Sequence, residues 1–170
     1  QPQIEALRSR PATVPAPAPT EAGRPAVAGD SYLEVGPMIA DVASTMTACA
    51  GSITSSQRTR WSAYAEQAVW NVWNYNNAQW GGRSHPWSGW SINNPGNNYY
   101  YSFVEATMYW ALASGNSTWF NFLRDNKLAA LNAAGPEQVA TANIGCLTHL
   151  QAGSALPVRH WIELIDEVLA

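Results

Sequence analysis

The segment from Trp80 to Asn98 combines aromatic rings and side-chain amides in one stretch. It reads WGGRSHPWSGWSINNPGNN and is dense in Gly, Pro, Asn and Ser, so the sequence predicts a loop. Aromatic faces stack on sugar rings, and amides hydrogen-bond to hydroxyls. We therefore predict a substrate-binding loop formed by Trp87, Trp90, Asn93 and Asn97. The alternative is a structured loop whose tryptophans cap a helix bundle.

Cys146 is the second residue in a setting suited to chemistry. It follows Gly145 at the start of an expected short helix, and His149 lies three residues later on the same face. A helix N-terminus favours the thiolate, so Cys146 is either a reactive thiol or ligand, or a small buried residue. Two ligands do not complete a metal site, because structural zinc takes four. We expect no metal site and no cofactor.

The composition excludes two classes of partner. Lys and Arg total 9 against 12 Asp and Glu, so the chain has no basic stripe and nucleic-acid binding is not expected. No apolar run approaches the ~20 residues that span a bilayer, and no signal peptide is visible. The 2 cysteines, Cys49 and Cys146, pair or stay free. The sequence leaves that choice and the oligomeric state open.

The sequence divides into three segments of different composition. Residues 1–29 are rich in Pro and Ala, which predicts a disordered linker or tail. Residues 30–134 form an aromatic-rich helical domain in this prediction. Residues 135–170 combine a short strand within EQVATANIG and an amphipathic helix in LPVRHWIELIDEVLA, with Pro157 in its first turn. The predicted fold class is therefore mainly α with a short strand–helix C-terminal tail.

Helical periodicity is clearest within SSQRTRWSAYAEQAVWNVWN, where Ser55 or Ser56 is the expected cap. One face of that helix carries apolar residues: Trp61, Tyr64, Ala65, Ala68, Val69, Val72 and Trp73. A later helix, YYYSFVEATMYWALASG, is apolar nearly all round with Glu105 as its one charge, so we expect it to be well buried. A helix capped by Asn116 or Ser117 follows and closes at Gly135.

Residues of about 32–122 resemble the helical toroid domain of bacterial polysaccharide-degrading proteins, the heparinase and alginate lyase-like class. The resemblance is carried by EVGPMIADVA, QRTRWSAYAEQAVWNVWN and WSGWSINNPGNNYYYSFVEATMYWALAS. It implies a partial α/α toroid-like bundle, an acidic or neutral polysaccharide as partner, and lyase chemistry on a uronic acid. In that chemistry Asn97 or Asn98 holds the carboxylate, and Tyr100 or His85 is the base.

Residues of about 123–170 resemble the C-terminal end of the iron–sulfur subunit of glycolate oxidase. The resemblance is carried by LAALNAAGPEQVATANIGCLTHLQAG and LPVRHWIELIDEVLA, and it implies electron transfer in 2-hydroxy-acid oxidation. That family's cysteine-rich domain combines paired cysteines with a later Gly-Cys, of which Gly145-Cys146 alone is present here. A cubane cluster takes four thiolates, so this chain by itself is not expected to hold one.

A fused, truncated or artificial chain would explain the join between the two resemblances near residues 122–130. Three functions remain open. The leading hypothesis is a carbohydrate-related protein resembling part of a polysaccharide lyase or hydrolase, with its activity undecided. The second is a fragment of an iron–sulfur electron-transfer subunit, and the third is a structural or interaction domain without activity. The first favours an extracytoplasmic location and the second a cytoplasmic one.

Overall fold

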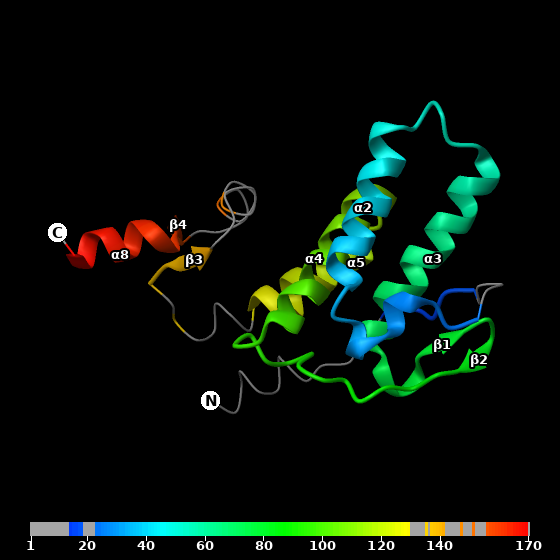
Figure 1. The fold of residues 1–170 in the computed structure, drawn as a ribbon, viewed down its shortest axis with the longest axis horizontal. Helices are drawn as coiled ribbons and strands as arrows, with labels where there is room; N and C mark the ends of the chain where they lie inside the picture. Colours follow the sequence, from blue (N-terminus) through cyan, green and yellow to red (C-terminus); the bar gives the residue numbers. More distant parts are fainter. Residues whose placement is uncertain are drawn as a thin grey trace. The chain divides into compact units, whose positions relative to one another are not determined.

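A computed structural model describes residues 14–18, 23–129, 135, 137–141, 147, 151 and 156–169. The chain divides into two compact units, Gln1–Ala129 and Ala130–Ala170. Over the described ranges the fold is mainly helical, with two small two-stranded sheets (Figure 1). The mainly α class with a short strand–helix segment near the C-terminus is therefore confirmed, whereas the toroid-like arrangement stays a prediction. None of the described helices is long and apolar enough to cross a bilayer.

The first unit is built on helices that pack against one another. Its helices are α2 (Val35–Ala48), α3 (Ser55–Trp73), α4 (Asn98–Ser114) and α5 (Ser117–Phe122), which continues into a π-helical turn, Leu123–Leu128. Helix α2 packs along α4, and α3 contacts both (Figure 1). Three 3-10 turns, Ala26–Ala28, Asp30–Tyr32 and Tyr75–Asn77, and the hairpin of β1 (Gln79–Trp80) and β2 (Arg83–Ser84) complete the unit.

The helix ends are fixed by local side-chain caps. Helix α3 begins with a capping box in which Gln57 N–H donates to Thr54 Oγ1 at 3.2 Å and Thr54 N–H donates to Gln57 Oε1 at 2.9 Å. The predicted cap at Ser55 or Ser56 is therefore wrong by one or two residues, because Thr54 is the residue with a Gln three positions later. The predicted cap at Asn116 is confirmed, since its Oδ1 accepts from Thr118 N–H at 2.9 Å.

The core of the first unit is filled by large aromatic side chains whose polar atoms are bonded. Trp73 Nε1 donates to Thr107 Oγ1 at 2.8 Å, and Trp80 Nε1 donates to the Tyr32 hydroxyl at 3.0 Å. The Glu66 carboxylate accepts from the indoles of both Trp110 and Trp119. These bonds stabilise the fold because a buried indole N–H without an acceptor would lose its hydrogen bonds to water and form none within the protein.

Part of the predicted N-terminal linker belongs to this core. Val14, Val27 and Ala28 are buried and join the apolar cluster of the first unit. Trp70 Nε1 donates to the carbonyl of Val14 at 3.0 Å. The prediction of a disordered segment over 1–29 is therefore wrong for these residues, because two valines and a backbone acceptor complete the surroundings of α3.

Helix α4 is less buried than its composition predicts. Tyr101 and Leu112 are 56% and 58% exposed, and Tyr109 is 39% exposed. The other side of α4 packs against α2, α3 and α5. The helix is therefore buried on one side and exposed to solvent on the other, although its residues are apolar on both sides.

The second unit contains a parallel strand pair followed by a helix. Strand β3 (Val139–Thr141) pairs with β4 (Val158–His160), with Val139 opposite Val158, and α8 (Trp161–Leu169) follows directly (Figure 1). The strand predicted within EQVATANIG is confirmed. The predicted helix begins later than Pro157, because Val158–His160 joins the sheet, and Val158 is buried on a strand rather than on the helix face.

Helices α2 and α4 approach each other closely at Gly36, in the first turn of α2. Its N–H donates to Ser102 Oγ of α4 at 2.8 Å. A Cβ added at Gly36 would lie 2.6 Å from Glu105 Oε2, 2.7 Å from Ser102 Oγ and 2.9 Å from Ser102 Cα. One of these atoms is backbone, so α2 and α4 would have to separate.

We expect Gly36→Ala to lower the free energy of unfolding by about 1–2 kcal/mol, because overpacking of about 1–3 kcal/mol exceeds the gain in helix propensity. Chemical denaturation measures this. Gly51→Ala is the matched control, since a Cβ there meets nothing within 4 Å. Equal stability of the two variants would show that the crossing tolerates a methyl group.

Candidate functional site

The loop that follows the hairpin is anchored to the core through Trp87. Its Nε1 donates to the carbonyl of Asn71 at 3.0 Å. Its ring lies 5.1 Å from that of Tyr32 and 5.9 Å from that of Phe103, between centroids. Trp87 was predicted to stack on a sugar, but these contacts favour the alternative in which it holds the loop on the bundle.

Trp90 is the exposed aromatic residue of the loop, at 56% exposure. Its neighbours Gly89 and Ser91 have positive φ angles of 66° and 61°. At Gly89 the chain runs over the ring of Tyr75, where a Cβ would lie 2.8 Å from Cγ. The backbone is thus held close to Tyr75 while the indole of Trp90 stays open to solvent, as stacking on a ligand requires.

The three asparagines of the predicted site have different roles. Asn93 Oδ1 accepts from Lys127 Nζ at 3.2 Å, and Asn97 Oδ1 caps α4 by accepting from Tyr99 N–H at 3.0 Å. Asn98 is exposed as the first residue of α4. The amide oxygens of Asn93 and Asn97 are therefore already engaged, and Asn98 is the amide most accessible to a ligand.

The two predicted bases lie in different surroundings. Tyr100 is 1% exposed, on the buried side of α4. His85 is half-buried, and its backbone N–H donates to the carbonyl of Ala78 at 2.7 Å, beside the hairpin. A polymer cannot reach the Tyr100 hydroxyl without opening the core, so the burial argues against its predicted role as base. His85 and Asn98 lie at opposite ends of the loop sequence.

Sequence reasoning missed Lys127, which joins this loop to the bundle. The side chain is 2% exposed, and its Nζ donates to the carbonyl of Ile92 at 3.3 Å as well as to Asn93. It also lies 4.4 Å from the ring centroid of Trp73. Burial lowers the pKa of Lys127 to about 8. The signal was present, because Lys127 follows Trp119 and Leu123 at four-residue spacing on the buried helical face.

A second missed group is the buried pair of Gln67 and Asn71 on α3, both 0% exposed. Gln67 Nε2 donates to Asn71 Oδ1 at 2.8 Å, and Asn71 Nδ2 donates to the carbonyl of Gln79 at 2.8 Å. Gln67 Oε1 has no hydrogen-bond partner within the described part of the chain. The pair fixes β1 on α3, and so positions the start of the loop.

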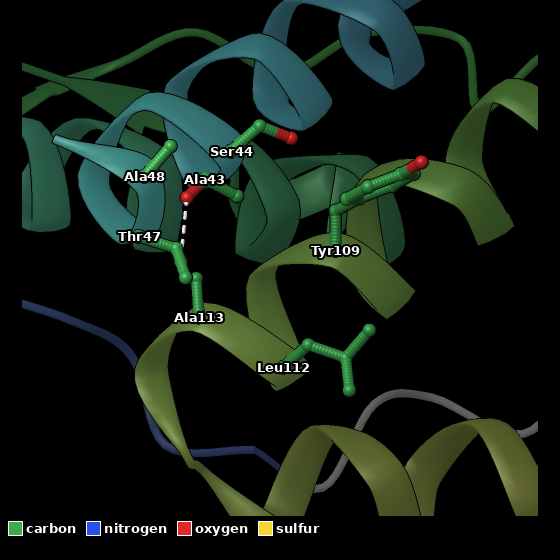
Figure 2. Close-up of a pocket in the computed structure, with 7 residues that line it drawn as sticks. All are labelled: Ala43, Ser44, Thr47, Ala48, Tyr109, Leu112 and Ala113. Atoms are coloured by element: carbon green, nitrogen blue, oxygen red, sulfur yellow. Dashed lines mark hydrogen bonds between the residues drawn. The ribbon is translucent and has the colours of Figure 1, made fainter.

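A shallow groove of about 360 Å³ lies between α2 and α4 (Figure 2). Its lining is small or apolar apart from hydroxyls: Ala43, Ser44, Thr47, Ala48, Tyr109, Leu112 and Ala113. Thr47 Oγ1 donates to the carbonyl of Ala43 at 3.0 Å, within its own helix. No predicted site residue lines this groove, and its lining residues include no carboxylate, imidazole, thiol or amine side chain.

Cys146 and His149, the residues considered for a metal or thiol site, lie outside the described residues. Cys49 is an exposed free thiol at the end of α2. Over the part of the chain that the structure describes, no group of three or more His, Cys, Asp or Glu side chains is placed to hold a metal ion. An iron–sulfur cluster does not fit this chain, because its sequence contains 2 cysteines and a cubane takes four thiolates.

Comparison with known proteins gives one short similarity. A 47-residue segment is 53% identical to the glycolate oxidase iron–sulfur subunit of Escherichia coli K12, and the match covers 28% of this chain and 12% of that protein. No family model and no solved structure matches the chain. The matched protein is of the kind that residues of about 123–170 were predicted to resemble, and nothing in the comparisons supports the toroid resemblance.

Lys127 gives the first unit a pH dependence. Its pKa is about 8 in the folded chain against an ordinary 10.5. Below pH 8 the amine is charged in both the folded and the unfolded chain, and burying the charge lowers the free energy of unfolding. As the pH rises from 8 to 10.5 the folded chain holds Lys127 neutral, so this loss of stability disappears. Relative to Lys127→Met, the wild type should gain about 3 kcal/mol of unfolding free energy between about pH 7 and 10.5. Chemical denaturation of both proteins across this range measures the gain.

Arg124→Met is the matched control, because Arg124 is an exposed cation of the same segment whose pKa is raised by its hydrogen bond to Asp125. Its stability difference from wild type should not change over this range. Lys127 is the chain's sole lysine, so its titration can also be followed by NMR without overlap. A midpoint at the ordinary value of 10.5 would contradict the buried position.

Proposed function

We propose that the chain acts in electron transfer during 2-hydroxy-acid oxidation, as the counterpart of one segment of a glycolate oxidase iron–sulfur subunit. The observation that carries the proposal is the identity of 53% over 47 residues. We assign this role to the second unit, Ala130–Ala170, with β3, β4 and α8. The matched segment spans 12% of the length of the E. coli protein, so the activity of that whole protein is not carried over.

The role we assign to this segment is packing and protein contact rather than cluster binding. With 2 cysteines in the sequence, the chain lacks the thiolates for a cluster of its own. The parallel strand pair and α8 are instead elements that shape and cover a protein surface.

A segment exchange tests this proposal. The 47 matching residues of the E. coli subunit are replaced by those of this chain, and glycolate-dependent dye reduction by the assembled enzyme is measured. We expect activity within about threefold of the parent, which corresponds to less than about 1 kcal/mol of lost transition-state stabilisation. A scrambled segment of the same composition is the control and should abolish assembly. Failure of the exchanged segment to exceed the scrambled one would refute the proposal.

A second candidate function is carbohydrate binding by the first unit, which we propose on the exposure of Trp90. An indole that is 56% exposed on a backbone fixed over Tyr75 is suited to stacking on a sugar ring. Asn98, exposed at the start of α4, supplies an amide for hydroxyls. The burial of Tyr100 favours binding without lyase chemistry.

We expect Trp90→Ala to weaken binding of a polysaccharide about 3–10-fold, since an aromatic stacking contact contributes about 0.5–1.5 kcal/mol. Affinity electrophoresis in gels containing acidic or neutral polysaccharides measures this. Tyr109→Ala, at an exposed aromatic residue on α4, is the matched control and should not change the mobility. Lyase action would in addition create an unsaturated product that absorbs in the near ultraviolet, and we expect none. If the wild type is not retarded by any polymer, this function is excluded.

A further inference from the structure

The loop between β2 and α4 is firmly anchored in its first half. The backbone N–H of Trp87 donates to the carbonyl of Tyr75 at 3.1 Å, and its indole donates to the carbonyl of Asn71 at 3.0 Å. Gly89 then runs over the Tyr75 ring, where a Cβ would lie 2.8 Å from Cγ. These contacts fix the chain as far as Gly89, and residues 90–96, which we call the flap, follow from that point.

The flap is joined to the helices through Lys127. Its other hydrogen bonds are local, such as the bond from Asn94 N–H to the carbonyl of Ser91 at 3.0 Å. Lys127 Nζ, from the turn after α5, donates to the carbonyl of Ile92 at 3.3 Å and to Asn93 Oδ1 at 3.2 Å. Among the hydrogen bonds described for this loop, these are the ones that cross from the flap to a helix. When the flap moves away, the amine must exchange both acceptors for water.

The described contacts of the amine are to uncharged groups. Besides its two acceptors in the flap, Lys127 Nζ lies 4.4 Å from the ring centroid of Trp73 and 5.8 Å from that of Phe122. Ring faces attract a cation. Burial outweighs this attraction and lowers the pKa of Lys127 to about 8. The charged amine is therefore less stable in contact with the flap than in water.

The carboxylates of the adjoining elements are engaged elsewhere. Asp125, on the same turn as Lys127, is exposed and bonded to Arg124 at 2.6 Å. Glu66 of α3 accepts from two indoles, and Glu105 of α4 lies over Gly36 of α2. Helix α5 carries no ionisable side chain.

The loop and α4 contribute further titratable groups. His85 lies beside the hairpin, before the anchored Trp87, and the hydroxyl of Tyr99 donates to Asp30 at 3.0 Å. The other tyrosines of α4 are one buried and two exposed residues: Tyr100, Tyr101 and Tyr109.

We propose that Lys127 is a proton-controlled latch: its neutral amine holds the flap, and with it Trp90, on the helices, and gain of a proton releases the flap. The latch goes beyond both proposed functions. Its effect on Trp90 rests on the proposed carbohydrate binding, because that function needs the indole on a fixed backbone.

The direction of the effect follows from the two environments of the amine. The pKa of Lys127 is about 8 with the flap in place, against the ordinary 10.5 of a hydrated amine. A lowered pKa in the closed form means that loss of the proton favours closure, so the flap closes as the pH rises from 8 to 10.5. Full hydration of the amine on opening sets the upper limit of this change in the ratio of open to closed chains. The limit is about 300-fold over the whole titration and about 25-fold between about pH 7 and 9.5.

Cleavage of the flap by subtilisin measures its opening. The full chain and Lys127→Met are digested at about pH 7 and 9.5, and cuts within residues 90–96 are timed by mass spectrometry. The ratio of the wild-type rate to the variant rate at one pH cancels the pH dependence of the protease and the ionisation of tyrosines. We expect this ratio to fall at least fivefold, and at most about 25-fold, between the two pH values. An unchanged ratio overturns the latch.

Arg124→Met is the matched control, since it removes an exposed cation from the same turn. The ratio of the wild-type rate to that of Arg124→Met should change less than twofold over the same pH range. Cuts that also spread over α3 and α4, and that urea accelerates as steeply as global unfolding, overturn the proposal, because opening of the flap alone exposes little surface.

Asn93→Asp tests the latch if Lys127→Met does not fold. The variant places a carboxylate where the amide oxygen lies, 3.2 Å from Lys127 Nζ, and so stabilises the charged amine in the closed form. We expect cleavage of the flap at about pH 7 to be at least fivefold slower than in wild type, with no further slowing as the pH rises. Cleavage as fast as in wild type, and with the same pH dependence, overturns the proposal.

Affinity electrophoresis in gels containing hydroxyethylcellulose or alginate separates the latch from the carbohydrate function. If the wild type is retarded, its affinity relative to Lys127→Met should rise at least threefold between about pH 7 and 9.5, because closure fixes the backbone of Trp90. Flap cleavage with the expected pH dependence, in a chain that neither polymer retards, supports the latch and removes the carbohydrate function for these polymers. Retardation that depends on Trp90, with an unchanged cleavage ratio, overturns the latch and leaves that function standing.

Discussion

The first unit depends on giving an acceptor to each tryptophan that it buries. Five indole N–H groups reach into the core from α3, β1, α4 and α5, and their acceptors come from elsewhere in the chain. Val14 O, Thr107, Tyr32 and the carboxylate of Glu66 satisfy them. Because a buried polar group without a partner is costly, these bonds select one arrangement among the many that apolar packing alone would allow.

The same requirement explains why the Trp-rich loop is only partly available for binding. The indole of Trp87 is bonded to the carbonyl of Asn71, and the amide oxygen of Asn93 to the amine of Lys127. Indole and amide side chains, which are suited to binding a ligand, can equally form the hydrogen bonds that hold their own loop in place. Trp90 and Asn98 are the predicted residues that remain exposed, and the proposed carbohydrate binding rests on these two side chains.

In the second unit, several large apolar side chains are exposed rather than buried. Its helix α8 exposes apolar side chains, and the two strands described in it form a parallel pair. A 47-residue segment of the chain is similar to an iron–sulfur subunit, over 12% of that protein's length.

The sequence by itself determined the helical character of α3 and α4, a cap at Asn116 or Ser117 and the strand within EQVATANIG. These are local features, fixed by spacing and side-chain chemistry over a few residues. It did not determine that Val158 pairs in a sheet, that Val14 and Val27 join the core, or that Tyr100 is buried and Trp90 exposed. Those outcomes, like the inward position of Lys127, depend on partners 30 or more residues away in several cases, such as Ile92 for Lys127 and Val14 for Trp70. Only the tertiary structure decides which of two equally suitable side chains is buried, because burial is a property of the surface that packs against a residue.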